Sequence, residues 1–276
     1  MTCIKDLIEA GDLDQVFLPL LPLFPQSFQY VRGELLERAW PVVKPMLEAR
    51  GVDTCRDRDS IIGEIMKDDP VELASEADSD PFKTLIRTIL SARSKDEQTI
   101  KVSEQLFKEY DTAEKLANAP PERVEEIIHP IGFFRAKTKS IMGAAKMLIN
   151  QYGGKVPDTF EELIELPGVG TKVANCVLVY AYGIPAIPVD THVHRITNRW
   201  GLVETTDPEK TTKQLEQLLP REWWMLINDL LIRFGKEICK PINPAHHQCP
   251  LNAICPKLEP KSKQGPKKSK RKKDGS

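Results

Sequence analysis

The chain of 276 residues has a formal net charge of −1, and 41% of its residues are hydrophobic, which is enough for a sizeable core in one or two soluble domains. Its longest apolar stretches, residues 16–25 and 176–189, contain prolines and are shorter than the roughly 20 residues of a membrane span, so a membrane-spanning protein is excluded. The first residues lack the basic start and apolar run of a secretory signal. We therefore expect a reducing compartment, in which the six cysteines are thiols or metal ligands.

The amino-terminal segment differs in composition from the rest of the chain. It is rich in leucine, contains Pro19, Pro22 and Pro25, and continues with helix-forming residues from 34 to 50. We predict that residues 1–56 form a separate small helical extension, and the sequence does not indicate its role.

The apolar pattern of the chain is helical almost everywhere. Apolar residues lie three and four positions apart in the stretches 82–90, 100–107 and 141–149, and no alternating strand pattern competes with them. Capping residues or first-turn prolines precede several helix-forming stretches, at positions 111–112, 120–122, 157–158 and 207–209. These signals predict an all-α protein.

A glycine pair in the stretch 166–170 (LPGVG) predicts a hairpin between two helices, at 160–166 and 171–182. Both glycines are able to adopt positive φ, which leaves consecutive backbone N–H groups pointing outward at the start of the second helix. Such a nest binds a phosphate oxygen without reading a base, because main-chain donors and the helix dipole attract an anion. The predicted contacts to a nucleic-acid backbone are Gly168, Val169, Gly170 and Thr171. A glycine pair alone also occurs in ordinary helix connections.

Lys172 and Asp190 are the candidate catalytic residues. Lys172 stands two positions after the glycine pair, and Asp190 follows eighteen residues later. A primary amine beside a phosphate-binding turn and a carboxylate can attack a sugar carbon and form a Schiff base. Each residue also has an ordinary interpretation, because a lysine in the first turn of a helix is usually solvated and an aspartate before Thr191 suits a helix N-cap.

The stretches 166–175 (LPGVGTKVAN) and 189–195 (VDTHVHR) resemble the endonuclease III family of helix-hairpin-helix DNA glycosylases and AP lyases. The resemblance covers roughly residues 56–258. It implies a two-lobed glycosylase fold at 57–258, with DNA bound between the lobes and a carboxyl-terminal metal or iron–sulfur loop. The implied division is a six-helix lobe at about 74–184, a second lobe of 57–73 plus 185–258, and a cluster loop at 239–255.

The function implied by the resemblance is base-excision repair of oxidised pyrimidines. Lys172 would attack C1′ of the damaged nucleotide, and burial near other cations would lower its pKa toward neutrality. Asp190 would stabilise positive charge on the sugar, and β-elimination would then cleave the abasic strand. The implied partner is double-stranded DNA with a damaged base or abasic site, bound by a monomer in the nucleus or the prokaryotic cytoplasm. A thymine or uracil mismatch glycosylase and an inactive DNA-binding scaffold remain as alternatives.

Three further residues are expected to contact DNA. By resemblance, Arg93 and Phe133 lie on the loops that wedge into the duplex when a base leaves the stack. The family usually has glutamine where Arg93 stands, and Phe133 would alternatively pack in the core beside Phe134. Lys240 lies in the cluster loop, which is expected to rest against DNA.

The metal ligands implied by the resemblance are Cys239, His246, Cys249 and Cys255. The family pattern has four cysteines separated by six, two and five residues, and here His246 takes the second place. Histidine ligates iron in some iron–sulfur centres, so a [4Fe–4S] cluster is chemically possible. A tetrahedral zinc ion with the same four ligands, or no metal, is the alternative. Cys3, Cys55 and Cys176 have no partner spacing, and we expect Cys176 to be a small packing residue.

The last residues, 259–276, are predicted to be a disordered basic tail. From Lys257 onward the chain carries a net charge of +7, and the remainder carries −8. The tail is rich in lysine, serine, proline and glycine and cannot bury enough apolar surface to fold. It is either a solvated tail or a segment drawn to phosphates.

Overall fold

The computed structural model describes residues 14–23 and 80–258, together with a few isolated positions: Ile4, Leu7, Ala10, Asp12, Trp40, Pro41, Lys44 and Glu48. The predicted basic tail, residues 57–79 of the predicted glycosylase, and Cys3 and Cys55 lie outside the described residues. Every regular element in the described part is helical, which confirms the all-α class. None of these helices combines the length and apolar character needed to cross a membrane.

The helices form two lobes, each with its own apolar core. One core contains buried residues from Phe82 to Ala186, and the other contains buried residues from Ile187 to Leu251 together with residues near the amino terminus, such as Ile4 and Phe17. The first lobe consists of α5 (Pro81–Ser91), α6 (Asp96–Glu109), α7 (Ala113–Ala117), α8 (Pro121–Ile128), α9 (Phe134–Tyr152), α10 (Phe160–Leu163) and α11 (Thr171–Tyr182). The second contains α2 (Asp14–Phe17), η1 (Leu18–Leu23), α12 (Thr191–Arg199), α13 (Pro208–Leu218), η3 (Arg221–Trp223), α14 (Trp224–Glu237) and η4 (His246–Gln248).

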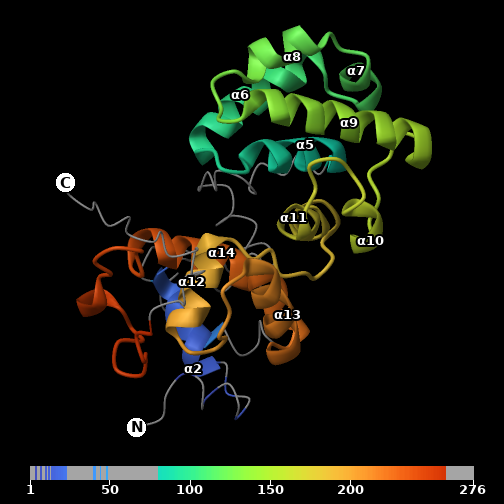
Figure 1. The fold of residues 1–276 in the computed structure, drawn as a ribbon. Helices are drawn as coiled ribbons and strands as arrows, with labels where there is room; N and C mark the ends of the chain where they lie inside the picture. Colours follow the sequence, from blue (N-terminus) through green and yellow to red (C-terminus); the bar gives the residue numbers. More distant parts are fainter. Residues whose placement is uncertain are drawn as a thin grey trace, which may run out of the picture.

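Helix α11 lies between the two lobes (Figure 1). It packs on α5 and α10 of the first lobe. On the other side, the Tyr180 hydroxyl donates a 2.7 Å hydrogen bond to Oδ1 of Asn228 on α14. The Asn228 side chain in turn donates to the carbonyl of Pro188, which stands just before α12. These bonds fix the start of α12 relative to α11.

Side-chain caps set the beginnings of several helices. The Asp80 carboxylate accepts a 2.9 Å hydrogen bond from the Phe82 backbone at the start of α5, and Asp207 caps α13 in the same way. The Thr112 hydroxyl caps α7. At α10 the cap is Thr159, one residue after the predicted pair at 157–158. Such caps satisfy backbone N–H groups that have no partner inside the helix.

The amino-terminal segment packs into the second core. Phe17 is fully buried, with its ring centroid 5.9 Å from that of Trp200 and 4.8 Å from that of Trp223. Leu20 and Leu21 of η1 are also fully buried, and η1 packs on α14. The described residues of the predicted extension are thus part of the second lobe, because their leucine-rich sequence buries its apolar surface there.

Candidate active site and metal centre

The hairpin between α10 and α11 is built from a short helix and a turn. Helix α10 ends at Leu163, three residues earlier than predicted. Pro167 explains this end, because proline has no N–H to donate and disfavours helical geometry at the residue before it. Two backbone hydrogen bonds stabilise the turn that follows. The Leu166 N–H donates to the Leu163 carbonyl at 3.2 Å, and the Val169 N–H donates to the Leu166 carbonyl at 3.0 Å.

The two glycines of the hairpin differ in conformation. Gly168 has φ +83°, and a Cβ atom there would lie 2.6 Å from Cβ of Ser140. Gly170 has φ −111° and is the N-cap residue of α11, so the prediction of positive φ at Gly170 is wrong. Both are exposed, whereas the Val169 side chain is buried. The hairpin therefore presents backbone to the surface, and its only left-handed glycine is Gly168, pressed against α9.

We predict that Gly168→Ala destabilises the protein by about 1–3 kcal/mol, because alanine would be strained at positive φ and would collide with Ser140. Gly170→Ala is the matched control. Its added methyl would meet no atom within 4 Å, and replacing a glycine cap by alanine costs about 1 kcal/mol or less. Urea denaturation of the two variants measures the difference. Equal losses of unfolding free energy would contradict this account of the turn.

Lys172 lies in the first turn of α11 and is partly buried. The charge of the Cys176 thiolate is the largest cause that raises the pKa of Lys172 above 10.5, and a hydrogen bond to Cys176 and the carboxylates of Asp190 and Asp96 also raise it. Burial acts in the opposite direction. The expectation of a lowered pKa is therefore wrong for the protein without DNA, because Cys176 adds a negative charge beside Lys172 where its thiol ionises, and Asp190 and Asp96 add theirs.

Asp190 is the N-cap residue of α12. Its Oδ1 accepts hydrogen bonds of 2.8 Å from the backbone N–H groups of His192 and Val193, so the structural role suggested by the sequence is confirmed. The preceding segment is tied to α11, because the buried Asn175 side chain donates a 2.9 Å bond to the Ile187 carbonyl. Helix α11 thus carries Lys172 and also anchors the chain that leads to Asp190.

The loops with Arg93 and Phe133 meet at the surface of the first lobe. Phe133 is 65% exposed, so it is not the core residue that the alternative interpretation required. The Arg93 guanidinium lies over the Phe133 ring, 5.9 Å from its centroid. Both residues have positive φ, 55° and 60°. The structure therefore brings these two predicted residues together.

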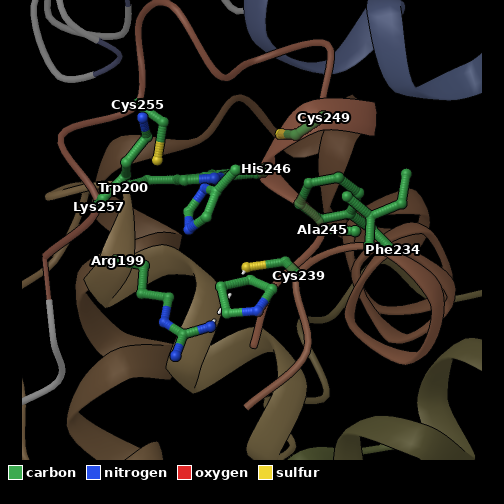
Figure 2. Close-up of a pocket in the computed structure, with 11 residues that line it drawn as sticks. Arg199, Trp200, Phe234, Cys239, Ala245, His246, Cys249, Cys255 and Lys257 are labelled. Atoms are coloured by element: carbon green, nitrogen blue, oxygen red, sulfur yellow. Dashed lines mark hydrogen bonds between the residues drawn. The ribbon is translucent and has the colours of Figure 1, made fainter. Parts of the chain in front are cut away.

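The predicted metal ligands line one cavity in the second lobe. Its walls include Cys239, His246, Cys249 and Cys255 (Figure 2). Trp200 closes another side of the cavity. Burial raises the pKa of the Cys249 and Cys255 thiols. Three sulfurs and an imidazole are a soft ligand set, which suits iron–sulfur clusters and zinc.

The size of this cavity favours a group larger than one ion. Its volume is about 50 Å³, whereas one water molecule needs only about 10–15 Å³. The volume of the cavity and the soft donors on its walls therefore fit an iron–sulfur cluster.

Two arginines of α12 hold the loop that carries the ligands. Arg199 donates to the carbonyls of Lys240, at 2.6 Å, and Pro241, at 3.0 Å, and to Sγ of Cys239, at 3.7 Å. Arg195 donates to the Cys239 carbonyl at 2.9 Å. The Lys240 side chain itself is exposed. These bonds fix the loop through its backbone and leave Lys240 free to meet a ligand at the surface.

Sequence reasoning missed several neighbours of these sites. Cys176 is buried as expected, but its contact with Lys172 was not predicted, although a spacing of four residues on a helix indicates it. Asp96 was not predicted either. Its carboxylate lies 3.0 Å from Nζ of Lys236 on α14 and so joins the two lobes near Lys172. No sequence signal indicates that pair, because its residues are 140 positions apart.

Comparison with known proteins connects this geometry to a family. Residues 86–221 match the HhH-GPD superfamily of base excision DNA repair proteins, and residues 239–255 match the iron–sulfur binding domain of endonuclease III. Endonuclease III of Thermotoga maritima is 47% identical over 178 residues, which cover 64% of this chain and 84% of that protein. Endonuclease III of Bacillus subtilis is 36% identical over 221 residues, which cover 80% of this chain and 98% of that protein.

The chain belongs to the endonuclease III family. A solved structure of a trapped endonuclease III–DNA covalent intermediate superposes with a TM-score of 0.63 at 37% identity, covering 70% of this chain and 90% of that one. Members of this family are base-excision DNA glycosylases with lyase activity, and this chain is a DNA-binding enzyme of that class with an iron–sulfur binding segment. The predicted family, fold and reaction class are confirmed.

Proposed function

We propose that this endonuclease III family member excises oxidised pyrimidines from double-stranded DNA, with Lys172 as the nucleophile and Asp190 as its carboxylate partner. The observation that carries the proposal is the place of Lys172 at the start of α11. It directly follows a turn of exposed backbone and lies within electrostatic reach of Asp190 and Asp96. A phosphate-binding turn, an amine and a carboxylate are then adjacent, as the reaction requires.

The reaction proceeds through a Schiff base. The neutral amine of Lys172 attacks C1′, the damaged base leaves with the bonding electrons, and proton transfers that Asp190 assists open the sugar ring to give an imine. The imine makes the C2′ proton acidic. Removal of this proton expels the 3′ phosphate, and water then hydrolyses the imine and releases Lys172 from the cleaved strand. Asp190 stabilises positive charge on the sugar before the imine forms.

The rest of the proposed DNA contact surrounds this centre. The backbone of Gly168, Val169, Gly170 and Thr171 binds a phosphate oxygen at the start of α11. Arg93 and Phe133 fill the space that the damaged nucleotide leaves. Lys240 contributes a positive charge from the cluster loop. The protein acts as a monomer on one lesion.

Strand cleavage of defined duplexes tests the substrate. Duplexes that carry thymine glycol, uracil, a T·G mismatch or an abasic site are incubated with the protein, and nicking is measured in single-turnover experiments. We expect nicking at thymine glycol and at the abasic site. Nicking at uracil or the mismatch without thymine glycol would support the alternative mismatch glycosylase, and the absence of any nicking would contradict the proposal.

The alkaline dependence of the reaction follows from the pair of Lys172 and Cys176. Burial raises the pKa of the Cys176 thiol above its ordinary value of 9.0, so the thiolate acts on Lys172 only in alkaline solution. There it keeps the amine protonated. In Cys176→Val this charge is absent, the pKa of Lys172 is lower, and more amine is neutral. We expect equal rates near neutral pH and a faster variant at alkaline pH, by about tenfold for each unit by which the pKa falls.

The rate of borohydride trapping on abasic DNA, measured against pH, checks this prediction. Trapping reports the enzyme-bound imine alone and is insensitive to the spontaneous breakage of abasic DNA in alkali. Superimposable profiles for the wild type and Cys176→Val would show that the thiolate does not act on Lys172.

We propose further that the cavity of the second lobe holds a [4Fe–4S] cluster ligated by Cys239, His246, Cys249 and Cys255. The space in the cavity and the soft donors on its walls support a cluster. When bound, the cluster supplies structural cross-links for the loop and no step of the reaction. The loop then holds Lys240 at the surface, where Arg199 fixes its carbonyl.

Metal analysis tests the cluster and its ligands. We expect iron and acid-labile sulfide in equal amounts in the wild type and a loss of both in Cys249→Ser. His246→Ala should lose iron faster than the wild type in the presence of a chelator, and His246→Cys should retain it. The exposed neighbour His247, changed to alanine, is the control. Zinc in place of iron, or identical iron release from His246→Ala and His247→Ala, would contradict the proposed ligands.

A further inference from the structure

Lys137 is a buried lysine in the first turn of α9. Only 7% of it is exposed, and its Nζ donates hydrogen bonds of 2.7 Å to the Leu90 carbonyl and 2.7 Å to the Ser94 hydroxyl. Burial lowers the pKa of Lys137. Burying an amine is unfavourable unless its donors are satisfied, so these two bonds are specific features of the site.

The partners of Lys137 belong to the two loops that meet at the surface. Leu90 and Ser94 flank the turn that carries Arg93, at the end of α5. The backbone N–H of Lys137 donates a 3.0 Å bond to the carbonyl of Phe133, which is the first helical bond of α9 and places Phe133 directly before the turn that carries Lys137. One residue is therefore bonded to the loop of Arg93 through its side chain and to Phe133 through its backbone.

Both loops have backbone geometry that needs such support. Arg93 and Phe133 have φ of 55° and 60°, in the left-handed region that non-glycine residues adopt only at a cost. A strained conformation persists when the surrounding bonds determine it. The buried ammonium supplies two of these bonds on the Arg93 side, and it stands one helical turn from Phe133.

We propose that Lys137 is a positioning residue that holds the Arg93 and Phe133 loops together so that both side chains enter the duplex as one unit. The inference rests on the proposed role of these two residues in filling the gap left by the damaged nucleotide. Lys137 itself touches no DNA, since it is enclosed beneath the loops. Its loss affects the reaction only where the damaged nucleotide must leave a stacked duplex.

The test compares one lesion in two settings. Lys137→Met removes the donors and keeps an unbranched side chain, and Ser94→Ala removes one acceptor. Lys139→Met, on the exposed side of the same helix turn, is the matched control. Single-turnover cleavage of an abasic site is measured in a duplex and in a single strand, where no stack has to be opened. Thermal unfolding is followed for each variant.

For Lys137→Met we expect the duplex rate to fall by about 10- to 100-fold relative to the single-strand rate, as for a displaced positioning group. Ser94→Ala should show a smaller change in the same direction, and Lys139→Met none. Parallel losses on both substrates, or a duplex-to-single-strand ratio equal to that of Lys139→Met, would overturn the inference. A wild-type protein that cleaves neither substrate would overturn the proposed function itself, and the role of Lys137 with it.

Discussion

Lys172→Gln will abolish the covalent adduct that borohydride traps between the protein and abasic DNA. Glutamine has a similar length and can still form hydrogen bonds, but its amide nitrogen has no basic lone pair to attack C1′. Strand cleavage should fall by at least about 10³-fold, which is typical when a covalent nucleophile is removed. Gel analysis of trapped protein and of nicked strands measures both effects in one experiment.

The control for this change is Lys146→Gln, at an exposed position of α9 in the same lobe. It makes the same chemical change away from α11 and should retain wild-type trapping. DNA binding by Lys172→Gln should persist, because the backbone of the hairpin is unchanged. Trapping that survives in Lys172→Gln would mean that another amine forms the imine, and the proposed mechanism would fall.

Asp190→Asn should separate catalysis from capping. The amide oxygen of asparagine can accept the two 2.8 Å bonds that Asp190 accepts from His192 and Val193, and asparagine is as good an N-cap as aspartate. The unfolding free energy should therefore change by less than about 1 kcal/mol, the cost of losing a charge at a helix start. The lyase rate should fall by about 10²–10⁴-fold, because the carboxylate no longer assists proton transfer.

Two further variants serve as controls for this result. Asp190→Ala also removes the cap and should cost an additional 0.5–2 kcal/mol, approximately, in unfolding free energy. Asp207→Asn makes the same change at the N-cap of α13, where Asp207 accepts a 2.9 Å bond from the Glu209 backbone, and should leave the rate unchanged. A lyase rate in Asp190→Asn equal to that of the wild type would show that Asp190 acts only as a capping residue.

The parts of this protein that could be predicted from sequence are those determined by nearby residues. Helix periodicity and caps such as Asp207 are local, and they placed most of the first lobe. The hairpin turn was also predicted, because glycine and proline act on their own backbone. Even there, Gly170 was assigned the wrong conformation, since only Gly168 is forced against another helix.

Contacts between distant segments could not be predicted. Lys137 bonds to Leu90, which is 47 residues away, and nothing in the sequence marks that lysine as buried. The pKa of Lys172 was predicted in the wrong direction because Cys176, its largest influence, was read only as a packing residue, and because Asp190 and the distant Asp96 add to the effect. Burial and charge at a site depend on every element that packs there, so they follow from the fold and not from the motif.

The position of Phe17 connects the beginning of the chain to the metal centre. Its ring packs on Trp200, and Trp200 lines the cavity of the predicted ligands. Coupling free energies are reciprocal. A group bound in the cavity therefore stabilises the packing of Phe17 on Trp200, and that packing stabilises binding of the group. Loss of the proposed cluster should therefore expose the amino terminus to proteases, and trimming the first 23 residues should hasten the release of iron.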